Sequence, residues 1–402
     1  MRTHRTVRLA LTTTAAVVTA LSLVAVPALA GTRSAKAIGD PYLAADTKLA
    51  TPATIGGAGS TFAAPLQNAA QAFYTSRTTG ATINGYQAVG SGTGESDILK
   101  QVVDWGGTDV PMTQNDIVQK EPSGHNFVLG RFLQVPIALG GVAISYDVPG
   151  LAAKTTLTLT AAVLAGIYEG SIKYWNSTEI QGLNPNVKLP HKQIVVVARA
   201  DSSGTTYIFT NFLRVAAPKV WTTAPSKTPP TLPTGGVAGS GNAGVAADIE
   251  NTPNSIGYVE YSYVLLNPSL LKGVAAIVNK AGKALTPSAV GIAAAAAAKP
   301  DVTATNFSIV WQPGQTTYPI AGYTWAVIWK VNRTTDAEGT LLVKYLDWLS
   351  HSGAVDGMIA GQDVAALQGY VPLPENIQAL ARKTLLKFTG SKGQPLLTTT
   401  AS

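Results

Sequence analysis

The polar stretch from Arg199 to Thr205 reads Arg-Ala-Asp-Ser-Ser-Gly-Thr and stands between two apolar segments. The β-branched run Ile194 to Val197 before it predicts a short buried strand. The segment Thr206 to Leu213 after it has apolar residues at four-residue spacing, which predicts a helix. Strand, polar turn and helix in this order form the repeating unit of an α/β fold.

The same stretch carries groups that suit an anion. Ser202 or Ser203 can cap the following helix, whose first backbone N–H groups then have no partner inside the helix. Such a terminus carries partial positive charge and attracts anions. Arg199 adds a planar fork that matches a tetrahedral oxyanion, and Asp201 is near enough in sequence to hold that fork. The alternative is an ordinary surface ion pair between Arg199 and Asp201 beside an ordinary capped helix.

Three more polar loops accompany predicted strands and helices. Gly57 to Phe62 precedes a helical stripe that contains Pro65, and proline suits the first turn of a helix. Gly90 to Gly94 follows the strand-like segment Thr82 to Val89 and leads into an acidic first turn. Asp104 to Asp109 ends in a carboxylate, although Asp in such a loop is most often only a turn or cap residue. Loops at the carboxyl ends of strands in an open α/β sheet converge, so we expect all four loops to meet.

The rest of the chain continues the alternation of strands and helices. Strands are predicted at Val135–Ser145, Ser255–Tyr261 and Tyr323–Val331, and helices within Leu151–Trp175 and at Gly291–Lys299, Leu341–Leu349 and Asn376–Phe388. This alternation predicts α/β lobes and argues against an all-β protein or a helical bundle.

Composition and the first residues indicate an exported globular protein. The chain has 402 residues, of which 46% are hydrophobic and 13% are charged, enough for two or three lobes with real cores. Residues 1–30 read as a signal peptide because three arginines precede an apolar run that ends in Ala-Leu-Ala, with an uncleaved anchor helix as the alternative. Its removal lowers the formal net charge from +7 to +4, since three arginines and no acidic residue are lost. Residues 31–54 lack periodicity and predict a flexible leader.

Several classes of function receive no support from the residues. The chain has no cysteine, so it has no disulfide, no thiolate chemistry and no lipidation site. The positive charge is weak and dispersed, so we expect no nucleic-acid partner. His125, His191 and His351 lack the spacing of metal ligands, and no Gly-x-Ser-x-Gly elbow is present. We therefore expect no metal, no cofactor and no catalytic residue.

Five stretches of the chain resemble, in the same order, those of the phosphate-binding protein of the phosphate-specific ABC importer, a periplasmic-type solute receptor. They are Gly57–Phe62, Gly90–Gly92, Asp104–Asp109, Arg199–Thr205 and Ile256–Tyr261. The resemblance extends from about Gly57 to about Lys387. It implies a two-lobed periplasmic-binding-protein-like fold, in which each lobe is a mixed β-sheet flanked by helices and hinge strands join the lobes.

The resemblance also implies domain boundaries and a binding site. Residues 55–138 and 319–402 would form lobe I, and residues 139–318 would form lobe II, with crossings near Leu139 and Tyr318. Lobe I would bind phosphate through Thr61, the backbone N–H of Phe62, Ser91 and Asp109; lobe II would use Arg199, Ser203, Gly204 and Thr205, with Ser60 and Asp201 in support. Ser202 and the pair Gly92-Thr93 depart from the family pattern, but both remain small and polar.

The implied function is that of an extracytoplasmic, non-catalytic receptor that binds inorganic phosphate between the lobes for uptake by an ABC importer. The expected partners are inorganic phosphate and the membrane permease, and we expect a monomer. An ionised Asp109 can only accept a hydrogen bond, so it would accept the hydrogen of phosphate and repel sulfate. Because the lipidation cysteine is missing, a phosphate binder free in the medium is one alternative. A secreted phosphatase and a binder of another oxyanion or of polyphosphate are the others.

Overall fold

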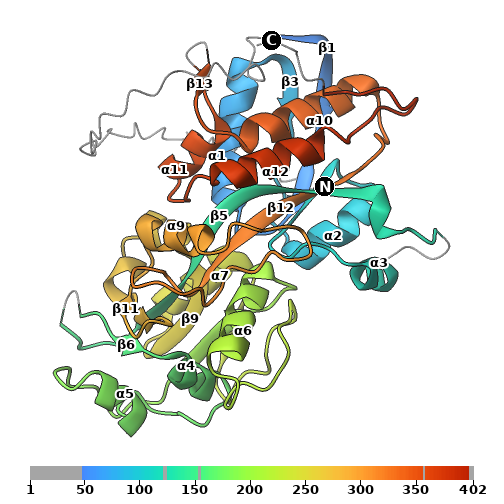
Figure 1. Cartoon of the computed structure of the whole chain (residues 1–402). Helices are drawn as coiled ribbons and strands as arrows, with labels where there is room; N and C mark the ends of the chain where they lie inside the picture. Colours follow the sequence, from blue (N-terminus) through green and yellow to red (C-terminus); the bar gives the residue numbers. More distant parts are fainter. Residues whose placement is uncertain (1–47, 121–124, 153–154, 356–357, 398–402) are drawn as a thin grey trace, which may run out of the picture. The chain divides into compact units, whose positions relative to one another are not determined.

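A seven-stranded mixed sheet organises the computed structural model, which describes residues 48–120, 125–152, 155–355 and 358–397 (Figure 1). These residues all belong to one unit of the chain, Asp40–Ser402. The strands of the sheet lie in the order β2 (Gly57–Gly59), β4 (Trp105–Thr108), β12 (Ala321–Trp329), β5 (Phe132–Asp147), β9 (Ser255–Glu260), β7 (Val195–Arg199) and β8 (Val237–Gly239). The predicted signal peptide lies outside the described residues.

Strand β5 connects the two ends of this sheet. It is 16 residues long and almost wholly buried, as its continuous apolar sequence requires. From Phe132 to Gly141 it pairs antiparallel with β12, and from Val142 to Asp147 it pairs antiparallel with β9. Figure 1 shows β5 and β12 side by side along this stretch. The predicted strands at Val135–Ser145 and Tyr323–Val331 are confirmed, although β5 is longer and β12 both begins and ends two residues earlier than predicted.

Helices cover the sheet, and several match the sequence prediction. Helix α6 (Gly204–Ala216) contains the predicted segment Thr206–Leu213, and all four of its periodic apolar residues are buried. The prediction within Leu151–Trp175 is confirmed only for α4 (Ala161–Tyr168), since the other described residues of that segment, 151–152, 155–160 and 169–175, are not helical. The helices are α1 (Ala64–Arg77), α2 (Ser91–Leu99), α3 (Gln114–Lys120), α4 (Ala161–Tyr168), α5 (Thr178–Leu183), α6 (Gly204–Ala216), α7 (Gly241–Asn251), α8 (Tyr261–Leu266), α9 (Ala289–Ala297), α10 (Asp336–Leu349), α11 (Gly361–Leu367) and α12 (Glu375–Leu385), with 3-10 turns at Leu129–Arg131 and Leu270–Gly273.

Smaller sheets account for the remaining strands and correct two predictions. Strand β1 (Lys48–Ile55) pairs parallel with β3 (Thr79–Ile83), so the predicted flexible leader is wrong for residues 48–54. Strand β3 ends at Ile83, so the predicted strand Thr82–Val89 is wrong beyond that residue. Two further small sheets contain β6 (Thr158–Leu159), β10 (Ala276–Val278) and β11 (Ala284–Leu285), and β13 (Ala354–Val355) with β14 (Met358–Ile359).

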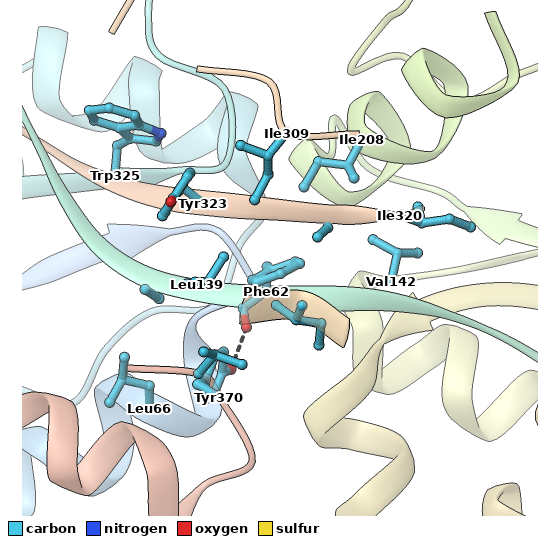
Figure 2. Close-up of a cluster of buried hydrophobic side chains, with 14 of the residues drawn as sticks. Phe62, Leu66, Leu139, Val142, Ile208, Ile309, Ile320, Tyr323, Trp325 and Tyr370 are labelled. Carbon is cyan, nitrogen blue, oxygen red and sulfur yellow. Dashed lines mark hydrogen bonds between the residues drawn. The ribbon is translucent and has the colours of Figure 1, made fainter. Parts of the chain in front are cut away.

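An apolar core surrounds the ring of Phe62, which lies two residues before the start of α1 (Figure 2). The ring is fully buried, which stabilises the fold by about 1.5–3 kcal/mol relative to an exposed ring. Gly140 on β5 permits this packing, because a Cβ there would lie 2.8 Å from ring atoms of Phe62. On the other side, the Tyr370 hydroxyl donates to the Phe62 carbonyl oxygen at 2.5 Å, the contact drawn in Figure 2. The loop that begins with Ser60 is therefore held from two sides.

Candidate functional site

The four polar loops singled out in the sequence come together at the ends of strands. Ser60 and Thr61 follow β2, Asp109 follows β4, and Arg199 ends β7. Ser91 begins α2, and its Oγ accepts from the backbone N–H of Asp109 at 3.3 Å and from that of Gly204 at 3.1 Å. The second of these contacts joins residues 113 positions apart in the chain. The arrangement follows the rule that loops at the carboxyl ends of parallel strands converge.

Arg199 is buried and fully oriented by its neighbours. Its Nε donates to Asp201 Oδ1 at 2.8 Å, and its Nη2 pairs with Asp201 Oδ2. Its Nη1 donates to Ser203 Oγ at 2.6 Å and to Thr205 Oγ1 at 3.3 Å. The alternative of an ordinary surface pair is therefore wrong, because the guanidinium is 1% exposed. A bidentate pair of this kind fixes both the position and the plane of the cation.

The cap of α6 is Ser203, one of the two predicted cap residues. Its Oγ accepts from the backbone N–H of Thr206 at 3.1 Å. Gly204 is the first residue of the helix and lies directly against Asp109, since a Cβ at Gly204 would lie 2.5 Å from Asp109 Oδ2. The positive end of α6 therefore faces the carboxylate.

Asp109 has one oxygen that is satisfied and one that is not. Its Oδ1 accepts from Ser60 Oγ at 2.5 Å and from Thr324 Oγ1 at 2.6 Å. Its Oδ2 is buried and has no hydrogen-bond partner among the described residues. Burial raises the pKa of Asp109 to about 6, against the opposing effect of the bonds from Ser60 and Thr324 and of the charge of Arg199. The carboxylate is thus ionised at neutral pH and presents a single open acceptor.

Four hydroxyls of the site, those of Thr61, Ser91, Ser203 and Thr205, are hydrogen-bond donors, in contrast to the acceptor Asp109 Oδ2. A hydroxyl oxygen accepts up to two hydrogen bonds and donates one. Ser91 and Ser203 each already accept two bonds from N–H groups of the protein. Thr61 accepts twice from Asn242, and Thr205 accepts once from Asn242 and once from Arg199.

None of these four hydroxyls has an acceptor for its own hydrogen among the residues that the structure describes. Because their acceptor capacity is filled, each can only donate to a further group. A guest at this place would therefore meet four O–H donors, the positive Arg199 and one acceptor, Asp109 Oδ2. That combination suits an oxyanion that carries a hydrogen.

The backbone of Phe62 also lies at the site, where its partner is the Ser60 hydroxyl. Its backbone N–H donates to Ser60 Oγ at 3.0 Å, and the same Ser60 hydroxyl donates to Asp109. Ser60 therefore orients both the carboxylate and the backbone of this loop, in line with its predicted supporting position.

Two residues that hold the site were missed in the sequence. Thr324 is the one threonine in β12 and has no serine beside it in that largely apolar strand, and this is the signal that could have singled it out. Asn242 belongs to the Gly- and Ser-rich stretch 239–244, which resembles the loops that were chosen and contains the start of α7, but we did not assign it to the site.

The described part of the chain offers neither a metal cluster nor a membrane-spanning helix. No group of three or more His, Cys, Asp or Glu side chains there is arranged to hold a metal ion. No helix there is long and apolar enough to cross a membrane.

Comparison with known proteins identifies the family. Residues 44–351 match the family model of the PBP superfamily domain. The chain is 33% identical to the phosphate-binding protein PstS of Pasteurella multocida (strain Pm70), over 85% of this chain and 93% of the relative. It is 35% identical to the phosphate-binding protein PstS of Methanocaldococcus jannaschii, over 73% of this chain and 75% of the relative.

Solved structures show the same fold. A high affinity periplasmic phosphate-binding protein, PfluDING, bound with phosphate, matches with a TM-score of 0.65 at 23% identity, over 82% of this chain and 93% of that one. A phosphate binding protein from Stenotrophomonas maltophilia matches with a TM-score of 0.62 at 20% identity, over the same shares of the two chains. The predicted α/β fold of the periplasmic-binding-protein type is confirmed. The chain therefore belongs to the PBP superfamily and, within it, to the family of PstS phosphate-binding proteins.

Proposed function

We propose that this protein is an exported receptor that binds inorganic phosphate and delivers it to the membrane permease of an ABC importer. The observation that carries the proposal is the polarity of the site. Four hydroxyls are committed to donating, and one buried carboxylate oxygen is left to accept. The names of the relatives, which are phosphate-binding proteins, point to the same ligand.

Phosphate satisfies both kinds of group. At neutral pH it carries one or two hydrogens, one of which can donate to Asp109 Oδ2, while its other oxygens accept from the hydroxyls and from Arg199. Sulfate has no hydrogen at this pH, so one of its oxygens would face the ionised Oδ2 without a proton between them. Two acceptors forced together in a buried place are costly, which gives selectivity by repulsion.

Each predicted residue takes a role in this proposal. Thr61, Ser91, Ser203 and Thr205 donate through hydroxyls, Arg199 neutralises charge and Asp109 accepts. Phe62 and Gly204 were expected to donate through their backbone N–H groups, but these N–H groups donate to Ser60 Oγ and Ser91 Oγ, so we give both residues a positioning role. Ser60 and Asp201 orient Asp109 and Arg199, respectively, through the hydrogen bonds described above. All the side chains that would donate or accept are buried, which favours a small enclosed anion over a polymer such as polyphosphate.

We propose further that residues 55–138 and 319–402 form one lobe and residues 139–318 the other, with the anion held between them. The support is that β5 crosses the first proposed boundary, where its residues Leu139 to Gly141 pair with the start of β12, and that Ser91 accepts from Gly204. Binding would then be coupled to closure about these strands, and a permease could recognise the closed form. We expect the protein to act as a monomer and without catalysis, like the binding proteins that it resembles.

The test is calorimetric competition on the mature protein with phosphate, arsenate, sulfate and polyphosphate. We expect a phosphate Kd of roughly micromolar or tighter, about −8 kcal/mol or better, and no detectable sulfate heat at pH 8. Arg199→Ala should abolish phosphate binding, while Arg214→Ala, at the far end of α6, should not. Preference for sulfate or polyphosphate would contradict the proposal. Steady hydrolysis of a chromogenic phosphate ester that Arg199→Ala abolishes would favour the phosphatase alternative.

A further inference from the structure

We propose that Asn242 is a positioning residue that aims the hydroxyl hydrogens of Thr61 and Thr205 at the bound anion. The inference rests on the proposed function and names a residue that would act without touching phosphate. Asn242 is the second residue of α7 and is fully buried. Its side chain bridges two hydroxyls that come from distant parts of the chain.

The orientation of the amide is fixed by its own oxygen. Asn242 Oδ1 accepts from the backbone N–H of Glu260 at 2.9 Å. The opposite orientation would set the NH2 group against that N–H, with two donors facing each other. Nδ2 must therefore face the site, where it donates to Thr61 Oγ1 at 3.0 Å and to Thr205 Oγ1 at 3.1 Å.

The start of α7 is also tied to the site through the backbone. The N–H of Asn242 donates to Thr61 Oγ1 at 3.1 Å. The N–H of Gly241 donates to Asp201 Oδ1 at 3.0 Å, the same oxygen that receives Nε of Arg199. The helix end is thereby held against both the threonine and the arginine that the anion would meet.

The N–H donors around Thr61 and Thr205 occupy the lone pairs of both hydroxyl oxygens, so each hydroxyl can act only as a donor to a further group. Both acceptor positions of Thr61 are taken by Asn242, and those of Thr205 are taken by Asn242 and Arg199. Without the amide, each hydroxyl would have an open lone pair and could turn to accept. With it, each hydroxyl is held as a donor before the anion arrives, which lowers the cost of ordering on binding.

A single substitution distinguishes the positioning role of Asn242 from a purely structural role. Asp is as good as Asn near a helix N-terminus and has almost the same shape, so a residue that only supports α7 should tolerate Asn242→Asp. An aspartate keeps the oxygen that accepts from Glu260 but replaces the donating NH2 by a second acceptor. Thr61 and Thr205 would then donate to the aspartate instead of the anion, and a negative charge would stand behind them.

The experiment measures phosphate binding by calorimetry for the wild type and for Asn242→Asp from pH 5 to pH 8. Asn251→Asp, an exposed position at the other end of α7, is the matched control. We expect the control to bind within about twofold of the wild type, since exposed charges change energies little. We expect Asn242→Asp to bind about 100-fold or more weakly at pH 8, because two hydrogen bonds to a charged guest are lost.

The ratio of wild-type to variant affinity should shrink as the pH falls, because the introduced carboxyl donates again once it is protonated. Asp109 and phosphate titrate in both proteins, and Glu260, Asp201 and Arg199 lie nearby in both. Taking the ratio of the two affinities at each pH cancels these shared effects. A variant that binds like the wild type at every pH would overturn the inference. So would a loss that does not depend on pH, because it would indicate damage to α7.

A second variant keeps the inference testable if Asn242→Asp does not fold. As single substitutions, Asn242→Ala should weaken phosphate binding about tenfold, and Thr205→Val should weaken it by more than that. If the amide acts through that hydroxyl, the double variant should lose less than the product of the two single losses. Strict multiplication, together with a similar result for Thr61→Val, would contradict the inference. Failure of the wild type to bind phosphate would instead refute the proposed function.

Discussion

Replacing Asp109 by Asn should convert a site that rejects sulfate into one that accepts it. Asp109 Oδ1 receives two hydroxyl donors, Ser60 and Thr324, so the amide oxygen of Asn should take that place. The NH2 group would then stand where Oδ2 stands now and would donate to a guest. The variant would thus imitate the protonated state of Asp109.

The magnitude follows from the titration of the carboxyl. Burial raises the pKa of Asp109 to about 6. Wild-type protein can bind sulfate only after a proton is added to Asp109, and at pH 8 this costs about two pKa units, or roughly 2.7 kcal/mol. Sulfate affinity of the wild type should therefore be constant below about pH 6 and fall about tenfold per pH unit above it. At pH 8 the Asn variant should bind sulfate about 100-fold more tightly than the wild type does.

Calorimetric titrations of both proteins with sulfate and phosphate from pH 5 to pH 8 test this reasoning. In Asp109→Asn, sulfate affinity should not vary with pH, and phosphate affinity should fall by about tenfold or more because its hydrogen loses an acceptor. Asp97→Asn, at a partly buried position of α2 for which we assign no role at the site, is the matched control. Equal losses for the two anions in Asp109→Asn would refute the role given to Oδ2. A sulfate affinity of the wild type that is flat across this range would do so too.

Three further substitutions have expected outcomes. Burial raises the pKa of Glu260 to about 8, so between about pH 4.5 and pH 8 the native state holds a proton that the unfolded chain has lost. The free energy of unfolding should therefore fall as the pH rises through this range, by up to about 1.4 kcal/mol per pH unit. Glu260→Gln should flatten this slope in urea titrations. Lys227→Met should lower the free energy of unfolding by about 2 kcal/mol in guanidinium denaturation, because the fully buried Glu95 carboxylate loses the Nζ that lies 2.8 Å away but keeps its ion pair with Lys120. Gly204→Ala should weaken phosphate binding about tenfold or more in calorimetry, since the added Cβ would lie 2.4 Å from the Cβ of Asp109.

Matched positions serve as controls for these substitutions. Lys219→Met removes an exposed lysine and should change stability little. Gly182→Ala adds a methyl group with nothing within 4 Å and should leave phosphate binding unchanged. Glu179→Gln, on an exposed carboxyl, should keep the wild-type pH slope. A control that behaves like its test variant would show that the substitution acts through something other than the named contact.

The sequence was most informative where structure is decided locally. The strand before Arg199, the cap at Ser203 and the apolar stripe of α6 follow from neighbours along the chain, and they were predicted close to their observed bounds. The convergence of the loops followed from a general rule for α/β sheets, not from any residue alone. The binding roles came from the resemblance to a family and stay predictions until ligand binding is measured.

What the sequence did not indicate depends on distant partners. Thr324 reaches Asp109 across 215 positions, and Asn242 reaches Thr61 across 181. Neither contact leaves a periodic signal near the residue itself. Strand β1 was missed for the same reason, because the residues from Lys48 to Thr54 become a strand by pairing with β3. Pairing between remote segments overrides the weak local preference of such residues.

The course of strand β5 has a consequence for attempts to dissect the protein. Its first ten residues, Phe132 to Gly141, are bonded to β12, and its last six, Val142 to Asp147, are bonded to β9. A fragment cut near Leu139 would leave a fresh row of unpaired peptide groups at the cut, and these would promote self-association. Recombinant pieces that divide the chain at that point should therefore precipitate, whereas a new pair of termini in an exposed turn such as Gly235 should leave the strand whole.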